Sequence, residues 1–378
     1  MQFRDLKAQY LYLKNDIDSA ISQVLNSSSF ISGKQVAELE TTLADYVGVK
    51  HCITCGNGTD ALSMILMAWN IKAGDAVFVP DFTFFASAEV VAFEGATPVF
   101  YDVCADTYNA DASSLEAAIQ AVLKEGRLVP RAIIAVDLFG LPANYDAIKK
   151  VAAKYHLLLL EDGAQGFGGS IRDQRACSFA DAAATSFFPA KPLGCYGDGG
   201  AIFTDNDDVA DYVRSIRVHG KGAFKYDNVR IGWNSRLDTI QAAVLQVKFK
   251  AFLANELDDV NSAAEKYTKL LKGMAELPVI PTGMRSSWAQ YTIRLKSEEQ
   301  RDGLQSFLKE HGIPSMVYYP KPMHGQKAFE GNQEYVKCTT AELLCRTVLS
   351  LPIHPYITDE EIISVVQSVG EYLGRNII

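Results

Sequence analysis

Between residues 49 and 204, short apolar runs alternate with segments of helical periodicity. The expected strands cover residues 49–54, 76–79, 98–102, 132–136, 157–161, 183–188 and 200–204, and the expected helices between them cover residues 60–69, 86–93, 112–123 and 144–155. Runs as uniformly apolar as these are typical of strands that are buried on both faces of a sheet. The alternation therefore predicts an α/β fold with a mostly parallel central sheet flanked by helices.

Helical periodicity also precedes and follows this region. We expect N-terminal helices over residues 6–25 and 35–46, a long helix over residues 237–272, and then a strand over 289–295 and helices over 298–311 and 359–372. This change of pattern predicts two domains. Residues 1–250 form a large α/β domain that includes the N-terminal helical segment, and residues 251–378 form a smaller C-terminal α+β domain.

Charge and composition exclude several classes of protein. The net charge is −9 and no dense cluster of Lys and Arg is present, so nucleic acid is not expected as a partner. The longest apolar runs are strand-sized, far below the roughly 20 residues of a membrane span. The charged N-terminal residues lack the apolar core of a secretory signal, so we expect a cytoplasmic protein.

Cysteine and histidine spacing favours no metal site. The seven cysteines are odd in number and dispersed, which favours reduced thiols over a disulfide framework. The segment from His51 to Cys55 resembles half of a zinc site, but no second ligand pair follows it. We therefore interpret it as part of a strand and expect no bound metal.

A glycine-rich turn, Gly56-Asn57-Gly58-Thr59, follows the first expected strand and leads into a helix. Free backbone N–H groups and the helix dipole at such a position can bind a phosphate. The alternative is a tight strand-to-helix turn in which Thr59 caps the helix.

Acidic residues end a second strand. Glu161 and Asp162 follow the apolar run 157–160, at the edge of a parallel sheet where ligands bind. A carboxylate there could hold a proton on the ring nitrogen of a heteroaromatic cofactor. The alternative is that the carboxylate caps a helix.

Lys191 is the only basic residue between Arg175 and Arg214, and its neighbours are aromatic, aliphatic or proline. Partial desolvation lowers the pKa of a lysine and frees its amine to attack a carbonyl and form a Schiff base. Pro189 and Pro192 prevent a helix here and fix the backbone. The alternative is a lysine that extends from a loop into solvent.

These features meet the needs of one cofactor, pyridoxal 5′-phosphate. The glycine loop offers donors to its phosphate, Phe84 offers a stacking face, Asp162 offers an anion for the ring nitrogen, and Lys191 offers an amine for the aldehyde.

Several motifs then resemble the DegT/DnrJ/EryC1/StrS family of nucleotide-sugar aminotransferases over nearly the whole chain. They are Phe3-Arg-Asp-Leu-Lys, Phe30-Ile-Ser-Gly33, Gly56-Asn-Gly-Thr-Asp-Ala-Leu62, Thr83-Phe-Phe-Ala86, Glu161-Asp-Gly-Ala-Gln165, the block 186–200, and Gly232-Trp-Asn-Ser-Arg-Leu-Asp-Thr-Ile-Gln-Ala-Ala243. The resemblance implies the fold type I of pyridoxal-phosphate-dependent transferases. Relatives with histidine in place of the lysine are dehydratases, and Lys191 argues against that activity.

The resemblance also implies roles around the cofactor ring. Lys191 would bond to the cofactor aldehyde and later move the proton between cofactor and substrate carbons. Asp162 would pair with the pyridine nitrogen, Gln165 would lie near the ring hydroxyl, and Phe84 would stack on the ring.

Further residues are implied at the phosphate. Gly58, Thr59 and Asp60 belong to the cofactor-binding loop, and Thr59 and Ser186 match phosphate ligands. Asn234 matches an asparagine that reaches the phosphate from the neighbouring subunit, so the resemblance implies a homodimer with shared active sites.

The substrate side is implied more coarsely. The closest subgroup uses L-glutamate to aminate C3 of a UDP-linked 3-oxo-N-acetylhexosaminuronic acid, in the synthesis of bacterial surface polysaccharides such as O-antigen. Arg236 would suit the sugar carboxylate, and Tyr318, Tyr319 and His324 lie in the segment expected near the sugar. Tyr318 stands where the family commonly has histidine.

Two alternatives remain open. One is a 3-oxo or 4-oxo 6-deoxyhexose on UDP, dTDP or GDP as substrate, since one fold can host many substrates. The other is a non-catalytic regulatory relative, against which the complete set of cofactor residues argues.

Overall fold

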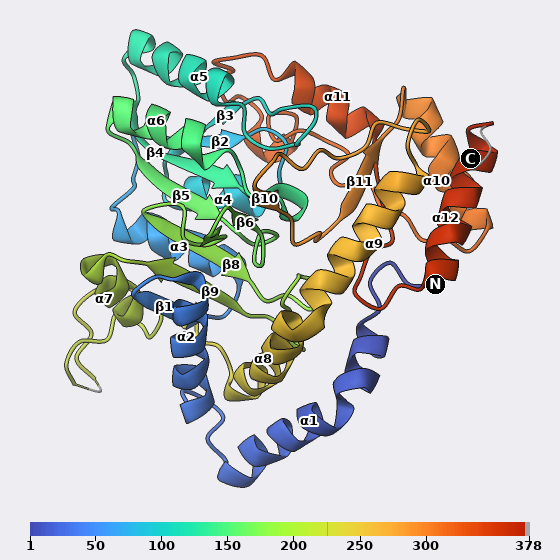
Figure 1. Cartoon of the computed structure of the whole chain (residues 1–378). Helices are drawn as coiled ribbons and strands as arrows, with labels where there is room; N and C mark the ends of the chain where they lie inside the picture. Colours follow the sequence, from blue (N-terminus) through green and yellow to red (C-terminus); the bar gives the residue numbers. More distant parts are fainter. Residues whose placement is uncertain (225, 375–378) are drawn as a thin grey trace.

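The computed structural model describes residues 1–224 and 226–374. Its centre is a seven-stranded sheet in the order β1-β9-β8-β5-β4-β2-β3 (Figure 1). The strands are β1 His51–Cys55, β2 Asp75–Pro80, β3 Thr97–Tyr101, β4 Val129–Val136, β5 Leu158–Asp162, β8 Ala182–Ser186 and β9 Gly200–Thr204. Only β9 runs against the other six strands of this sheet. The expected α/β fold with a mostly parallel sheet is confirmed.

Helices cover both faces of this sheet. Alternate residues of each strand point to opposite faces, so that Val77 and Val79 pack beneath one helical layer while Ala76 and Phe78 pack beneath the other. The first layer contains α3 Gly58–Ala68, α4 Ala86–Phe93 and α7 Asp207–Ile216. The opposite face carries α5 Ala112–Glu125 and α6 Tyr145–Tyr155 and, over β1 and β9, α2 Lys34–Val47 and α8 Thr239–Ala251. Burial on both faces explains why the strands are apolar throughout.

A long helical rod connects the sheet to the C-terminal elements (Figure 1). It consists of α8, a π-helical turn at Phe252–Glu256 and α9 Leu257–Leu270, where the sequence predicts one uninterrupted helix over 237–272. Residue 251 lies inside this rod. The division into domains of residues 1–250 and 251–378 therefore stays a prediction.

The C-terminal part is a small α+β unit. It contains β11 Tyr291–Arg294 paired antiparallel with β12 Val348–Leu351, together with α10 Glu298–Glu310, α11 Thr339–Thr347 and α12 Asp359–Tyr372. A second small sheet joins β6 Ser170–Ile171, β7 Gln174–Arg175 and β10 Met284–Arg285. The N-terminal segment returns to this unit, since the N–H of Ile353 donates to the carbonyl of Phe3 at 3.3 Å.

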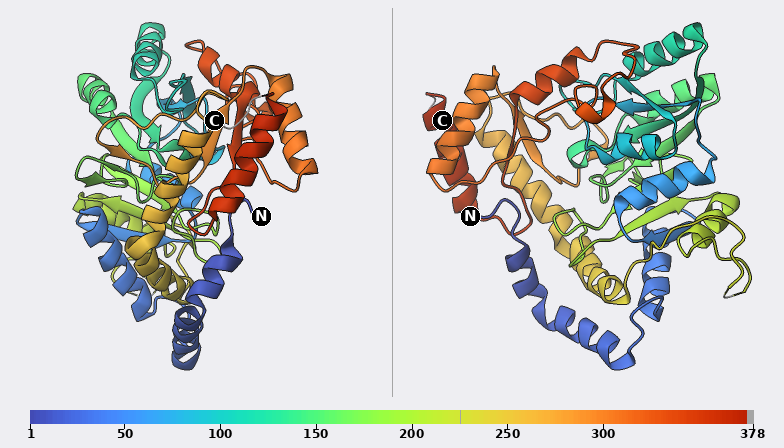
Figure 2. Two further views of the ribbon diagram at one scale, coloured as in Figure 1. Left: turned by 45° about the vertical axis from the view of Figure 1, so that its right-hand side comes forward. Right: turned by 180° about the vertical axis from the view of Figure 1, so that it is seen from behind.

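Helix α1, Leu6–Ser27, projects from the body of the molecule in both views of Figure 2. It packs on α8 through Leu13 and Ile17, while Leu11 and Tyr12 are exposed. None of the helices in residues 1–224 and 226–374 is long and apolar enough to cross a membrane.

Several elements differ from the expected ones. The strand predicted over 183–188 ends at Ser186. The N–H of Phe187 still donates to the carbonyl of Gly199 at 2.7 Å in the register of β9, and Pro189, which has no N–H, cannot extend the ladder further. Helix α7 is not predicted, although Asn206 caps it by accepting from the N–H groups of Asp208 and Val209. Helix α11 and strand β12 are also absent from the sequence prediction.

Candidate active site

The site lies where two neighbouring parallel strands end. Asp162 ends β5 and pairs in register with Ala184 of β8, which ends two residues later at Ser186. The Asp162 side chain is only 5% exposed and accepts from Ser87 Oγ at 2.7 Å and from the N–H of Ala164 at 3.2 Å. Burial raises the pKa of Asp162, and the two hydrogen bonds and the charge of Lys191 oppose that rise. Ser87, one helical turn after Thr83, is a partner that the sequence analysis missed.

Lys191 lies in the loop that connects β8 with β9. The loop is folded tightly, since the N–H of Lys191 donates to the carbonyl of Phe188 at 2.9 Å. Burial lowers the pKa of the Lys191 ammonium, the carboxylate of Asp162 opposes this, and the guanidinium of Arg4 adds to it. A lowered pKa enlarges the fraction of neutral amine, which is the form that attacks a carbonyl.

The glycine loop packs directly against Ser186. A Cβ added to Gly58 would lie 2.8 Å from Ser186 Cβ, so only glycine fits without movement. Asn57, and not Thr59, caps α3, because the Asn57 side chain accepts from the N–H of Asp60 at 2.8 Å. The first N–H groups of α3 therefore lie beside the end of β8, in the arrangement that binds anions at a helix N-terminus.

The carboxylate of Asp60 is already engaged within the chain. Ser235 Oγ donates to it at 2.6 Å and accepts from the N–H of Gly56 at 2.9 Å. This contact anchors the segment that contains Asn234 and Arg236 to the glycine loop. The Asn234 side chain is exposed and accepts from the guanidinium of Arg236.

Arg236 faces a separate cavity of about 110 Å³. Residues of α2, Thr54 and Arg217 also line this cavity. Arg217 pairs there with Glu40 at 2.6 Å. The other three residues expected at the substrate, Tyr318, Tyr319 and His324, do not line it, so within the single chain Arg236 lies apart from them.

Three of the predicted residues, Gln165, Phe84 and Tyr318, contact a fourth, Tyr319. Its hydroxyl accepts from Gln165 Nε2 at 3.0 Å, and its ring centroid lies 6.0 Å from that of Phe84 and 5.7 Å from that of Tyr318. Gln165 is fixed from its other end, because its Oε1 accepts from the N–H of Phe139 at 2.7 Å. The Phe84 side chain is 53% exposed, which leaves an aromatic face available for stacking.

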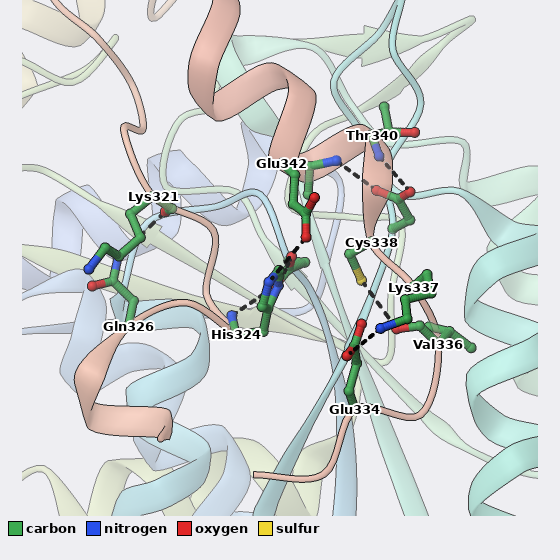
Figure 3. Close-up of polar contacts among 12 residues, drawn as sticks. Lys321, His324, Gln326, Glu334, Val336, Lys337, Cys338, Thr340 and Glu342 are labelled. Carbon is green, nitrogen blue, oxygen red and sulfur yellow. Dashed lines mark hydrogen bonds and ion pairs between the residues drawn. The ribbon is translucent and has the colours of Figure 1, made fainter. Parts of the chain in front are cut away.

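Both ring nitrogens of His324 face carboxylates (Figure 3). Nδ1 lies 2.6 Å from Oδ2 of Asp81, and Nε2 lies 3.6 Å from Oε1 of Glu342. Asp81 is fully buried, and its Oδ1 also accepts from the N–H of His324 at 2.8 Å. Burial raises the pKa of Asp81, and the contacts with His324 oppose that rise. His324 thus connects its segment to the end of β2. The sequence analysis did not name Asp81, although its position directly after an apolar run could have indicated a residue at the edge of the sheet.

These residues fit pyridoxal 5′-phosphate. A partly buried lysine could bond to the aldehyde, a buried carboxylate could accept from the ring N–H, and the start of a helix next to a glycine loop could bind the phosphate. The described part of the chain holds no cluster of three or more His, Cys, Asp or Glu residues suited to a metal. Fold and site together define a pyridoxal-phosphate-dependent transferase of fold type I.

The chain belongs to the DegT/DnrJ/EryC1/StrS aminotransferase family, whose model matches residues 12–370. The expected family is therefore confirmed, and with it a sugar transaminase activity that depends on pyridoxal 5′-phosphate. Solved structures that match this fold include a relative with the bound pyridoxamine form of the cofactor.

Three relatives are similar to this chain over nearly the whole length of both chains. It is 44% identical to UDP-2-acetamido-2-deoxy-3-oxo-D-glucuronate aminotransferase of Pseudomonas aeruginosa, over 94% of this chain and 96% of the relative. It is 41% identical to UDP-N-acetyl-3-dehydro-alpha-D-glucosamine 3-aminotransferase of Acidithiobacillus ferrooxidans, over 95% and 94%. A DegT/DnrJ/EryC1/StrS aminotransferase from Brucella abortus superposes with a TM-score of 0.96 at 48% identity, over 99% and 100%.

Proposed function

We propose that this enzyme transfers the amino group of L-glutamate to C3 of a UDP-linked 3-oxo-N-acetylhexosaminuronic acid. The observation that carries the proposal is the end-to-end similarity to the Pseudomonas aeruginosa relative, which is named for such a substrate. The name of the Acidithiobacillus ferrooxidans relative shares the UDP group, the N-acetyl group and the 3-keto group. The two named substrates differ at C6, where the first has a carboxylate.

The cofactor, when bound, supplies the electron sink and carries the amino group between the two half-reactions. Asp162 pairs its carboxylate with the ring nitrogen and keeps a proton there. Gly58, Thr59 and Ser186 bind the phosphate, with Asp60 fixing the loop through Ser235.

At the reacting carbons, Lys191 moves the proton. Its lowered pKa, caused first by burial, supports this role because a neutral amine can accept a proton at neutral pH. Phe84 supports the cofactor ring from one face, and Gln165, which is held by Tyr319 and Phe139, lies at the ring hydroxyl.

The sugar is bound by Tyr318, Tyr319, His324 and Arg236. Tyr318 and Tyr319 border Phe84 and Gln165, which supports a sugar at that edge of the cofactor. Arg236 binds the C6 carboxylate, for which its planar guanidinium suits a bidentate contact.

The enzyme acts as a cytoplasmic homodimer in the synthesis of a bacterial surface polysaccharide such as O-antigen. Exposed apolar side chains near Asn234 support the dimer, since Phe224 is exposed and Ile231 is 87% exposed. Exposed apolar groups of this kind mark protein interfaces. Asn234 then reaches the phosphate in the partner's site, and Arg236 the partner's substrate.

The first test is the visible absorbance of the protein with pyridoxal 5′-phosphate before and after L-glutamate is added. Glutamate should convert the pyridoxal form to the pyridoxamine form. If the band forms and glutamate leaves it unchanged, the donor or the reaction type is wrong.

The second test compares UDP-linked 3-oxo-N-acetylglucosaminuronate with UDP-linked 3-oxo-N-acetylglucosamine, which lacks the carboxylate. Arg236→Met should lower kcat/KM for the acid about 10- to 100-fold, because a charge-assisted hydrogen bond contributes about 1.5–3 kcal/mol. The rate with the neutral sugar should stay nearly constant, and Arg230→Met, which removes an arginine packed on the Tyr212 ring, serves as the control. Higher kcat/KM for a 6-deoxyhexose or a 4-keto sugar would overturn the substrate assignment.

A further inference from the structure

Two cations, the half-buried Arg4 and the buried Lys248, hold the main chain of the Lys191 loop. Arg4 Nη2 donates to the carbonyl of Lys191 at 3.1 Å and to the carbonyl of Pro192 at 3.5 Å. Lys248 Nζ, from α8, donates to the carbonyl of Gly194. Three carbonyls within four residues thus receive donors from segments far away in the sequence.

The loop needs donors from outside because its own geometry leaves these carbonyls without partners. Pro189 and Pro192 offer no N–H groups, and the loop is so tight that a Cβ on Gly194 would lie 2.5 Å from the carbonyl oxygens of Phe188 and Pro189. Buried carbonyls without a partner cost free energy, so the loop is stable in this shape only with the two cations in place.

The cations share a single buried carboxylate. Glu256, in the π-helical turn, accepts from Gln9 Nε2 at 2.9 Å and from the Tyr356 hydroxyl at 2.6 Å. Its charge attracts both Arg4 and Lys248.

Burial dominates the electrostatics of this cluster. It lowers the pKa of Lys248, which is 1% exposed, to about 8 and that of Arg4 to about 10, and Glu256 opposes both shifts. Burial, and to a smaller extent the charge of Arg4, lower the pKa of His354 to about 4, so at neutral pH it adds no charge. The groups that act on the Lys191 amine are the Asp162 carboxylate and the Arg4 guanidinium.

We propose that Arg4 is a positioning residue for the transamination, which fixes the Lys191 backbone through its two carbonyl contacts, with Lys248 as the second donor. The inference rests on the proposed role of Lys191. Phe3, the neighbour of Arg4, has its ring centroid 6.2 Å from that of Tyr318. The same short segment therefore contacts both the lysine loop and the expected sugar site.

The test uses the holoenzyme and four variants. Arg4→Met removes the charge and the donors, Arg4→Lys keeps the charge but loses the planar fork, Lys248→Met removes the second donor, and Lys7→Met removes an exposed charge nearby as the matched control. Each variant is first shown to form the absorbance band of the bound cofactor. If neither the wild type nor any variant forms that band, the proposed role of Lys191 itself is wrong.

Two quantities are then measured: the midpoint pH of the absorbance change of the bound cofactor, and kcat with KM for the nucleotide sugar. Arg4→Met should raise the midpoint, because it removes a positive charge that disfavours a proton on the Lys191 nitrogen. It should lower kcat about 10- to 100-fold, as a misplaced catalytic group does, with KM nearly unchanged. Lys248→Met should lower kcat less.

Arg4→Lys separates charge from geometry. It should leave the midpoint near that of the wild type and still lower kcat, while Lys7→Met should change neither quantity. If Arg4→Met keeps the wild-type midpoint and kcat, or lowers only the melting temperature, Arg4 is a purely structural residue and the inference is wrong.

Discussion

Gly58 lies so close to Ser186 that a single added methyl group should push apart the two elements that we propose bind the phosphate. In Gly58→Ala the new Cβ would lie 2.8 Å from Ser186 Cβ and 3.3 Å from Ser186 Cα. Ser186 ends β8 and is held in the sheet opposite Gly200, so it cannot turn away. Overpacking of this kind costs about 1–3 kcal/mol, and the reduced freedom of the unfolded alanine chain offsets about 0.4–1 kcal/mol.

We therefore expect Gly58→Ala to lower the free energy of unfolding by about 1–2 kcal/mol and to weaken cofactor binding about tenfold, the equivalent of about 1.4 kcal/mol. Urea unfolding measures the first quantity, and a titration of the unloaded protein with pyridoxal 5′-phosphate measures the second. The double variant Gly58→Ala/Ser186→Gly removes the shortest contact, at 2.8 Å, so it should recover part of the lost stability. It should not recover affinity, because it lacks the Ser186 hydroxyl. A Gly58→Ala protein as stable as the wild type, or a double variant no more stable than Gly58→Ala, would refute the steric argument.

Three further predictions concern charged groups. Lys191→Ala should abolish both the absorbance band of the bound cofactor and turnover, and normal turnover in a coupled glutamate assay would contradict the assignment of the lysine. His324→Gln should destabilise the protein by about 1–3 kcal/mol at pH 7, because it removes the ring nitrogen that contacts the buried Asp81 carboxylate. The pKa of Asp81 is raised, so this loss should shrink as the pH falls and Asp81 becomes protonated, and equal losses at pH 5 and pH 8 in urea unfolding would count against the pairing. Ser87→Ala removes a hydrogen bond that lowers the pKa of Asp162. The acid limb of the pH profile of kcat/KM should therefore move to higher pH. If it does not move, Asp162 does not act as an anion in the reaction.

The sequence was sufficient for those parts of the site that lie at the ends of strands. Asp162 and Gly58 stand where an apolar run stops, and a parallel sheet places such positions along one edge. Lys191 was distinguished by its apolar neighbours. Each of these signals is local, and the expected fold followed from the same local patterns.

The partners of these residues could not be predicted in the same way. Ser87 reaches Asp162 from a helix 75 positions away, and Arg4 reaches Lys191 across 187 positions. Such contacts depend on how helices and termini pack on the sheet, which periodicity does not encode. The π-helical turn at Phe252–Glu256 was missed for a related reason, since its five residues leave the apolar pattern nearly helical.

The cap of α3 shows a finer limit. Asn57 and Thr59 are both residue types that cap helices, and they stand two positions apart. Asn57 is the cap because the extended backbone there lets its side chain accept from Asp60, while Thr59 is already within the helix. The sequence analysis named only Thr59 as the cap, and the structure corrects this to Asn57.

The span between Arg4 and the Lys191 loop has a consequence for how the enzyme matures. Long-range contacts form late, because the loop-closure entropy must be overcome before they can form. The pairing of Phe3 with Ile353 links the segment of Arg4 to the last strands of the chain. We therefore expect that a partly folded chain contains an ordinary, protonated lysine, and that a nucleophilic amine arises only when both ends of the polypeptide have docked.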